Sequence, residues 1–149
     1  MTSPTIVNRK ALQGYEVLER YTAGIALLGA EVKSLRQGGG QLQDAFCRFK
    51  GGELYLYNMY IAPYGQAGYI RVPERRPRKL LLREEELKRL QGRLTQKGLT
   101  LIPLRLFFNP RGWAKVEIAL VQGRRKFDRR EAIRAREERR TMERLRKRY

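Results

Sequence analysis

Residues Leu99–Val121, LTLIPLRLFFNPRGWAKVEIALV, predict two antiparallel strands joined by a turn at Asn109-Pro110-Arg111-Gly112. Proline presets the backbone for such a turn. Apolar and charged residues alternate along both arms, and this spacing is typical of a half-buried hairpin. We expect one face to pack, with Ile102, Leu104, Leu106, Phe108, Val116, Ile118 and Leu120, and the other to be wet, with Arg105, Lys115 and Glu117.

Two further segments of the chain have strand character. Tyr15–Leu28 interleaves β-branched and aromatic residues with charges, which predicts a strand with a bend at Gly24. Ala45–Ile61 predicts a second hairpin, because two apolar-rich runs flank Lys50-Gly51-Gly52-Glu53, where glycine permits a tight turn. We expect the Gly38–Gly40 triplet to be a flexible turn.

Two helices are expected between these strands. Leu82–Gln96 has leucines near helical spacing and three glutamates in its first turn, and the shorter run Ala30–Gln37 is bounded by glycines. Short strands with few helices in about 120 residues indicate a mainly β protein. The predicted fold is a single OB-like antiparallel β-barrel, residues 1–122, with two or three short flanking helices and a basic C-terminal tail, residues 123–149.

The charge of the chain indicates a polyanionic partner. It has 33 Lys and Arg against 15 Asp and Glu, a net charge of +18. Nucleic acid is the usual partner of such a protein, and an anionic membrane is the weaker alternative because no apolar run approaches 18 residues. Most of the cations are arginine, which suits phosphate and guanine, although a GC-rich genome gives the same bias. A single cysteine, Cys47, and no visible secretory signal indicate a cytoplasmic protein.

The residues that are missing argue against catalysis. Histidine, the usual general base and metal ligand near neutral pH, does not occur in the sequence. One cysteine cannot build a zinc site with Cys or His partners, and no glycine-rich loop is followed by Lys-Ser or Lys-Thr. We therefore expect no catalytic residue, no metal and no cofactor.

Residues Gly123–Tyr149 form a strongly basic tail with 13 Lys and Arg, 5 Asp and Glu and few apolar side chains. Such a segment cannot bury enough apolar surface to order itself, yet it has helix-forming residues throughout. Opposite charges recur at helical spacing in the pairs Glu131–Arg134, Glu137–Arg140 and Glu143–Lys147. We predict a tail that is disordered when free and helical on a polyanion, the alternative being a solvated tail with no role.

One block of the sequence resembles a known family. Gly29-Ala30-Glu31-Val32-Lys33-Ser34-Leu35-Arg36 is similar to the Gly-x-Glu-Val-Lys-Ser-Leu-Arg signature of small protein B, the SsrA-binding (tmRNA-binding) proteins of bacterial trans-translation. Further matches follow the family's order and cover nearly the whole chain: Asn8-Arg9-Lys10-Ala11, Ala23-Gly24-Ile25-Ala26-Leu27, Arg78-Lys79-Leu80-Leu81-Leu82, Leu101–Lys115 and Gly123-Arg124-Arg125-Lys126-Phe127-Asp128-Arg129-Arg130.

The resemblance implies a monomeric adaptor that makes and breaks no bond. Its body would bind the tRNA-like domain of tmRNA, and its tail would enter the decoding site and mRNA channel of the small subunit of the 70S ribosome. The implied RNA-binding residues are Asn8, Arg9, Lys10, Glu31, Lys33, Ser34, Arg36, Arg76, Arg78, Lys79 and Leu81. The implied ribosome-binding residues of the tail are Gly123, Lys126, Phe127, Asp128, Arg129 and Arg130, with Gly123 as a hinge and Phe127 stacking on a base.

Two positions leave alternatives open. Glu31 either accepts hydrogen bonds from RNA bases, holds a neighbouring arginine, or caps the first turn of its helix. Many family members carry an acidic residue where this chain has Thr22. This chain has either lost that RNA contact or replaced it through Glu31 or Gln13.

Three functions remain to be separated at this point. The first is the trans-translation adaptor. The second is a general OB-like RNA chaperone or ribosomal protein, which would bind many RNAs equally and lose affinity steeply with salt. The third is a metal-dependent nuclease that uses scattered carboxylates, which would cleave RNA only when a divalent metal is present.

Overall fold

The computed structural model describes residues 4–65 and 72–123, and this part of the chain is mainly β. The strands are β1 (Ile6–Val7), β2 (Tyr15–Ile25), β3 (Gly40–Gln41), β4 (Phe46–Lys50), β5 (Glu53–Tyr57), β6 (Tyr60–Ile61), β7 (Arg78–Leu81), β8 (Leu99–Phe108) and β9 (Ala114–Gly123). The helices are α1 (Gly29–Arg36) and α2 (Glu84–Arg93).

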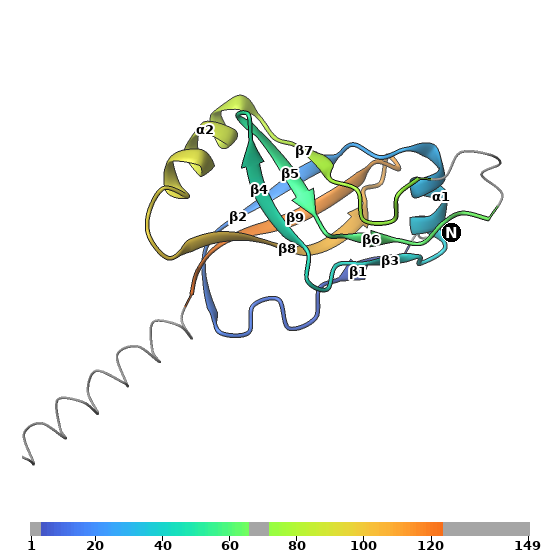
Figure 1. The fold of residues 1–149 in the computed structure, drawn as a ribbon, viewed down its shortest axis with the longest axis horizontal. Helices are drawn as coiled ribbons and strands as arrows, with labels where there is room; N and C mark the ends of the chain where they lie inside the picture. The colour runs from blue at the N-terminus through green and yellow to red at the C-terminus, as the bar shows by residue number, and fades with distance from the viewer. Residues whose placement is uncertain (1–3, 66–71, 124–149) are drawn as a thin grey trace, which may run out of the picture.

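The larger sheet closes on itself. Its strands pair in the order β1-β8-β4-β5-β7-β2-β9, and β8 and β9 also pair with each other, so the sheet is ring-like and its pairings are antiparallel. Figure 1 shows α1 at one end of this sheet, while α2 and the final residue of β9 lie toward the other end. A ring of strands leaves few unpaired edges, which are otherwise prone to aggregation.

The hairpin expected over Leu99–Val121 is confirmed as β8 and β9. Its turn is held by Asn109, whose Oδ1 accepts hydrogen bonds from the backbone N–H groups of Arg111 at 3.1 Å and Trp113 at 2.8 Å. Gly112 closes the turn with a φ of +85°, a conformation that favours glycine.

The alternation expected along β8 is wrong at two positions. A register shift between Pro103 and Arg105 interrupts the alternation of side chains along the strand. The residues that face the core before the shift are therefore out of phase with those that face it after the shift. Leu101, which precedes the shift, is therefore buried, as is Leu106, which follows it, while Ile102 and Leu104 are only partly buried.

The strand β2 pairs with two other strands. Along most of its length it pairs with β9, and at Gly24 and Ile25 it pairs with β7. The bend expected at Gly24 thus coincides with the position where β2 has a neighbour on each side, while the observed register shift lies earlier, between Val17 and Glu19. A Cβ atom on Gly24 would lie 3.3 Å from Leu81 Cβ, so glycine allows the two strands to approach closely here.

The core fills the interior of the sheet and extends to both helices. Leu54, Leu56 and Leu80 are buried from β5 and β7, and Leu120 is buried from β9. Leu35 of α1 and Leu90 of α2 are each 0% exposed, so each helix is anchored by one leucine. α2 is also fixed by Arg89, whose Nε donates to Glu19 Oε1 on β2 at 2.9 Å.

The glycine triplet Gly38–Gly40 is more tightly packed than the flexible turn we expected. Gly38 has a φ of +80° and ends α1, with its N–H donating to the Leu35 carbonyl at 2.9 Å. Gly40 begins β3, and a Cβ atom there would lie 2.5 Å from Leu35 Cδ2 and 2.6 Å from Ile6 Cδ1. Glycine is therefore favoured at Gly38 by the backbone conformation and at Gly40 by the buried side chains directly beneath the chain.

Replacement of Gly40 by alanine is expected to lower the free energy of unfolding by about 1–3 kcal/mol, because the added methyl group overpacks the core. The matched control is Gly92→Ala, since nothing lies within 4 Å of a Cβ there and its helical position favours alanine by up to about 1 kcal/mol. Urea titrations of both variants test this. Equal stability of the two variants would contradict the packing described for Gly40.

Candidate nucleic-acid interface

The helix α1 begins with a capping interaction made by one of its own side chains. Glu31, three residues after Leu28, accepts a hydrogen bond at Oε1 from the Leu28 backbone N–H at 2.9 Å. This satisfies a donor that the first turn would otherwise leave unpaired. Lys33 and Arg36 lie in the last turn, where cations are favoured by the helix dipole.

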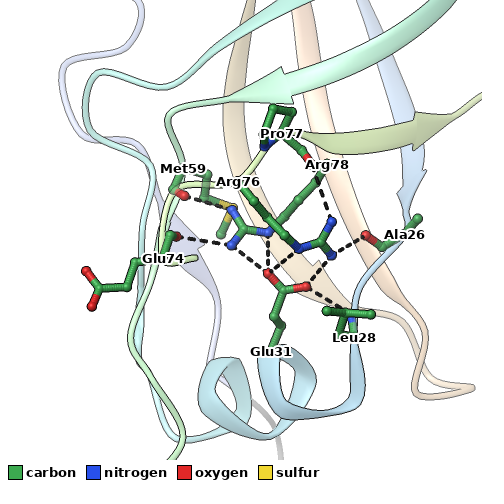
Figure 2. A network of polar contacts seen from close by, with 8 residues as sticks. All are labelled: Ala26, Leu28, Glu31, Met59, Glu74, Arg76, Pro77 and Arg78. Atoms are coloured by element: carbon green, nitrogen blue, oxygen red, sulfur yellow. Dashed lines mark hydrogen bonds and ion pairs between the residues drawn. The ribbon is translucent and has the colours of Figure 1, made fainter. Parts of the chain in front are cut away.

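Glu31 also binds two arginines from the segment that leads into β7 (Figure 2). Its carboxylate pairs with the guanidinium of Arg76, and its Oε2 accepts from Arg78 Nε at 2.6 Å. Arg78 in turn donates to the Met59 carbonyl at 2.8 Å and the Glu74 carbonyl at 3.1 Å. The Glu31 side chain is 3% exposed and that of Arg78 is 0% exposed, so this is a buried ion pair that joins α1 to the first residue of β7.

The partners of Glu31 keep it ionised. Burial alone would raise the pKa of this carboxyl group, but the hydrogen bonds from Arg76, the Leu28 N–H and Arg78 together hold the pKa below its usual value. Burial lowers the pKa of Arg78, and the hydrogen bond to Glu31 opposes that shift. The pair is therefore charged near neutral pH, and its hydrogen bonds satisfy the buried carboxylate.

This geometry decides among the three roles considered for Glu31. It caps α1 and holds two arginines, so both carboxylate oxygens are occupied inside the protein. The side chains of Glu31 and Arg78 are both buried, which argues against the direct RNA contact predicted for each of them. The same argument applies to Ser34, which is 3% exposed and packs against Gly39.

Lys33 and Arg36 occupy the exposed side of α1 and lie over aromatic rings. Lys33 Nζ is 5.6 Å from the centroid of the Tyr64 ring, and the Arg36 guanidinium is 5.3 Å from that of Phe108. Arg36 also donates to the Gly112 carbonyl at 3.5 Å, which brings the β8–β9 turn beside α1. We call Lys33, Arg36 and the two rings beneath them the α1 surface.

Asn8 is bonded to the sheet, whereas Arg9 and Lys10 are exposed to solvent. Asn8 binds β8, with Nδ2 donating to the Pro103 carbonyl at 2.8 Å and its backbone N–H donating to the Leu104 carbonyl at 2.8 Å. It therefore fills the irregular part of β8, which is a structural role. Arg9 and Lys10 are exposed, and Lys10 has a φ of +65° in the turn that follows.

The remaining predicted residues of the body lie along or beside β7. Arg76 is engaged with Glu31 and keeps a quarter of its side chain exposed. Lys79 pairs with Glu53 at 3.0 Å, and Leu81 is 51% exposed beside Gly24. Thr22 is exposed on β2, and the burial of Glu31 argues against Glu31 as a replacement for an acidic RNA contact at that position.

Sequence reasoning missed the rings beneath the cations and the exposed Trp113. Trp113 is 68% exposed at the β8–β9 turn, close to the position where Arg36 meets Gly112. The missed signal is an aromatic residue that directly follows the Asn-Pro-Arg-Gly turn, because aromatic side chains seldom occupy such wet positions without a partner.

Of the residues predicted for the tail, the structure describes Gly123. Lys126, Phe127, Asp128, Arg129 and Arg130 lie outside the described residues. Gly123 is the last residue of β9, where it pairs with Tyr15 and donates to the Gly98 carbonyl at 3.2 Å. The strand therefore includes Gly123, one residue beyond the boundary we expected. Across residues 4–65 and 72–123, neither helix has the length and hydropathy needed to cross a bilayer.

Comparison with known proteins assigns the family. A family model described as SmpB protein matches residues 5–148. The chain belongs to the SmpB protein family. It is 50% identical over 143 residues to the SsrA-binding protein of Thermus thermophilus, which covers 96% of this chain and 99% of the relative. The SsrA-binding protein of Desulforamulus reducens is 50% identical over 137 residues, 92% of this chain and 85% of that protein.

A solved structure agrees with this SmpB membership. It carries the name "tmRNA-SmpB: a journey to the center of the bacterial ribosome" and matches with a TM-score of 0.67 and 55% sequence identity. The match covers 81% of this chain and 85% of that chain. The fold of an SmpB protein is thus shared over most of the described residues.

Replacement of Glu31 by glutamine is expected to destabilise the protein by about 3–5 kcal/mol, because it leaves the buried Arg78 charge without a counter-charge. Glu53→Gln is the matched control, since the Glu53–Lys79 pair is exposed and its loss should be much smaller. Chemical denaturation at pH 7 measures both.

The same pair predicts how stability depends on pH. The folded-state pKa of Glu31 lies below the unfolded value of about 4.3, so this contribution is complete above that value and is lost as pH falls through the folded pKa. Stability should therefore fall more steeply with acid in the parent protein than in Glu31→Gln. Identical acid dependence would show that Glu31 is not held in the ionised form by this network.

Proposed function

We propose that this SmpB protein is an RNA-binding adaptor of ribosome rescue, which binds the tRNA-like domain of tmRNA and delivers it to stalled ribosomes. The observation that carries the proposal is the α1 surface in a chain that is 50% identical to SsrA-binding proteins over nearly its whole length. Two cations on one rigid helix suit RNA, which proteins recognise through phosphates, 2′-hydroxyls and stacked bases. Trp113, exposed at the turn beside α1, would extend this contact, while Arg9 and Lys10 are exposed in the turn after β1.

The course of β9 supports a division of labour between body and tail. This strand runs for ten residues from the turn beside α1 to Gly123, a span of about 30 Å. An RNA bound at the α1 surface and a partner bound by the residues after Gly123 would therefore meet the protein at opposite ends of β9. This arrangement suits a protein that joins one large partner to another.

We also propose a specific fold for the sheet and a specific behaviour for the tail. The ring-like sheet is proposed to be an OB-like barrel, a fold that commonly binds nucleic acids. The tail after Gly123 is proposed to be unstructured when free and helical in the ribosome, because its composition offers charge but little apolar surface. The residues of the tail that would contact the decoding site and mRNA channel are Lys126, Phe127, Asp128, Arg129 and Arg130. For this function the protein would act as a cytoplasmic monomer and would need no catalytic activity.

The adaptor is separated from a general RNA chaperone by competition. Labelled tmRNA bound to the protein at physiological salt should resist displacement by an excess of bulk tRNA or ribosomal RNA. Equal displacement by all three RNAs would favour the chaperone, because binding to phosphate alone does not discriminate sequence.

Replacing Lys33 and Arg36 together by alanine should weaken binding of the tRNA-like domain and reduce the salt slope by about two units, because two phosphate contacts are lost. The control is Lys88→Ala with Lys97→Ala, which removes two exposed cations from α2 and the segment after it. Filter-binding titrations at several salt concentrations give both slopes. An unchanged slope in the first variant argues against the α1 surface.

Removing residues 124–149 should leave binding of the tRNA-like domain largely intact and abolish peptide tagging on stalled ribosomes. The cut follows Gly123 so that β9 stays complete. Binding titrations and a reconstituted tagging assay measure the two activities separately. Normal tagging by the shortened protein would refute the division between body and tail.

A further inference from the structure

The outer face of β4, β5 and β7 carries aromatic and cationic side chains that the core does not use. The inward residues of these strands, Cys47, Leu54, Leu56 and Leu80, are buried. The alternate residues therefore point away from the core. In register across the three strands, the outward side chains form one row of Arg48, Tyr55 and Lys79 and a second row of Phe46 and Tyr57.

The rings on this face contact one another. The Phe46 and Tyr57 rings are stacked, with centroids 5.4 Å apart and planes 15° from parallel, and the Tyr55 and Tyr57 centroids are 6.2 Å apart. The Arg48 guanidinium lies 5.0 Å from the Phe46 centroid. Phe46 nevertheless remains 38% exposed, so the group keeps an aromatic surface open to solvent.

The charge around these rings favours an anionic partner. Arg48 and Lys50 are exposed on β4, and within the described residues neither has a carboxylate at ion-pair distance. Glu53 lies next to these rows, in register with Lys50, and its carboxylate is shared by Lys79, at 3.0 Å, and the Tyr55 hydroxyl, at 2.9 Å. That sharing holds the Tyr55 ring and the Lys79 ammonium side by side.

We propose that Phe46, Arg48, Tyr55 and Tyr57, the β4–β5 platform, form a second RNA-binding surface that takes unpaired nucleotides. Flat rings bind the faces of bases, and a neighbouring cation binds the backbone; this combination is the usual means of holding single-stranded nucleic acid. Duplex RNA keeps its base faces stacked on one another and offers the rings little. Stacking within the sheet accounts for contact between the rings but not for the unpaired Arg48 beside them.

The platform is separate from the α1 surface in residues and in chemistry. It shares no side chain with Lys33, Arg36 and the rings beneath them, and it lies on strands rather than on a helix. The inference goes beyond the proposed function, and it holds whether or not the α1 surface binds tmRNA. A protein with both surfaces could contact a folded RNA at one and an unpaired segment of RNA at the other.

Cross-linking with a ten-nucleotide oligouridine that carries 4-thiouridine tests the platform in the full chain. Peptide mapping should place cross-links within residues 46–57, and a duplex of the same length should give few there. Arg48→Ala keeps all the rings and should raise the RNA concentration for half-maximal cross-linking at this site about threefold or more. The matched control is Arg105→Ala, because Arg105 also lies over a ring, Phe107, but is paired with Glu117.

A second pair of variants tests the rings themselves. Phe46→Ala with Tyr57→Ala should weaken cross-linking at Tyr55 about tenfold or more, and Phe46→Tyr with Tyr57→Phe should restore it. If the alanine pair does not fold, Arg48→Ala and the conservative pair still decide. Binding of the tRNA-like domain by Arg48→Ala should equal that of the parent protein, so failure of the platform and failure of the α1 surface are read separately.

Two results would overturn the proposal. One is that cross-links map only outside residues 46–57, for example to residues 124–149. The other is that Arg48→Ala and Arg105→Ala cross-link equally well at the platform in correctly folded protein.

Discussion

The buried contact between Glu31 and Arg78 determines the position of the helix α1. A charge inside a protein is costly unless it is paired and hydrogen-bonded, and here the Glu31 carboxylate accepts from Arg76, Arg78 and the Leu28 N–H. Arg78 extends the network to two backbone carbonyls. These contacts tie α1 to the first residue of β7 and to the backbone at Met59 and Glu74, and they hold the helix against the sheet. A fixed helix presents Lys33 and Arg36 at defined positions, which shape recognition of RNA requires.

The elements that the sequence predicted well are those whose signals are local. Both hairpins follow from alternation and from turn residues, and Gly51 and Gly112 have the positive φ that such turns need. The faces of β8 were predicted less well, because the register shift after Pro103 depends on pairing with β9 and on the contact with Asn8. Neither partner can be read from the alternation of β8 itself, so Ile102 and Leu104 were placed on the wrong face.

The helix α1 was predicted from the sequence, but the burial of its charged residues was not. The motif around Glu31 pointed to α1, yet its charged residues divide into a buried set and an exposed set. Lys33 and Arg36 are two and five residues after Glu31, so they lie on other sides of the helix. The family resemblance placed Arg78 among the RNA-binding residues, whereas its side chain is fully buried, which is rare for arginine. Its burial depends on a carboxylate 47 residues away, and such long-range pairing leaves no local signal.

The distribution of ion pairs separates two kinds of surface on one basic protein. On the outer face of β2, β8 and β9, Glu117 pairs with both Arg20 and Arg105, so these arginines meet a carboxylate of the protein itself. Lys33 and Arg36 meet aromatic rings instead, and the described residues give neither of them a carboxylate partner. A ring orients a cation without cancelling its charge, whereas a carboxylate cancels it. Lys33 and Arg36 therefore keep a positive charge that no carboxylate of the described residues offsets, and a polyanion approaching a protein with this excess of positive charge would be attracted to them.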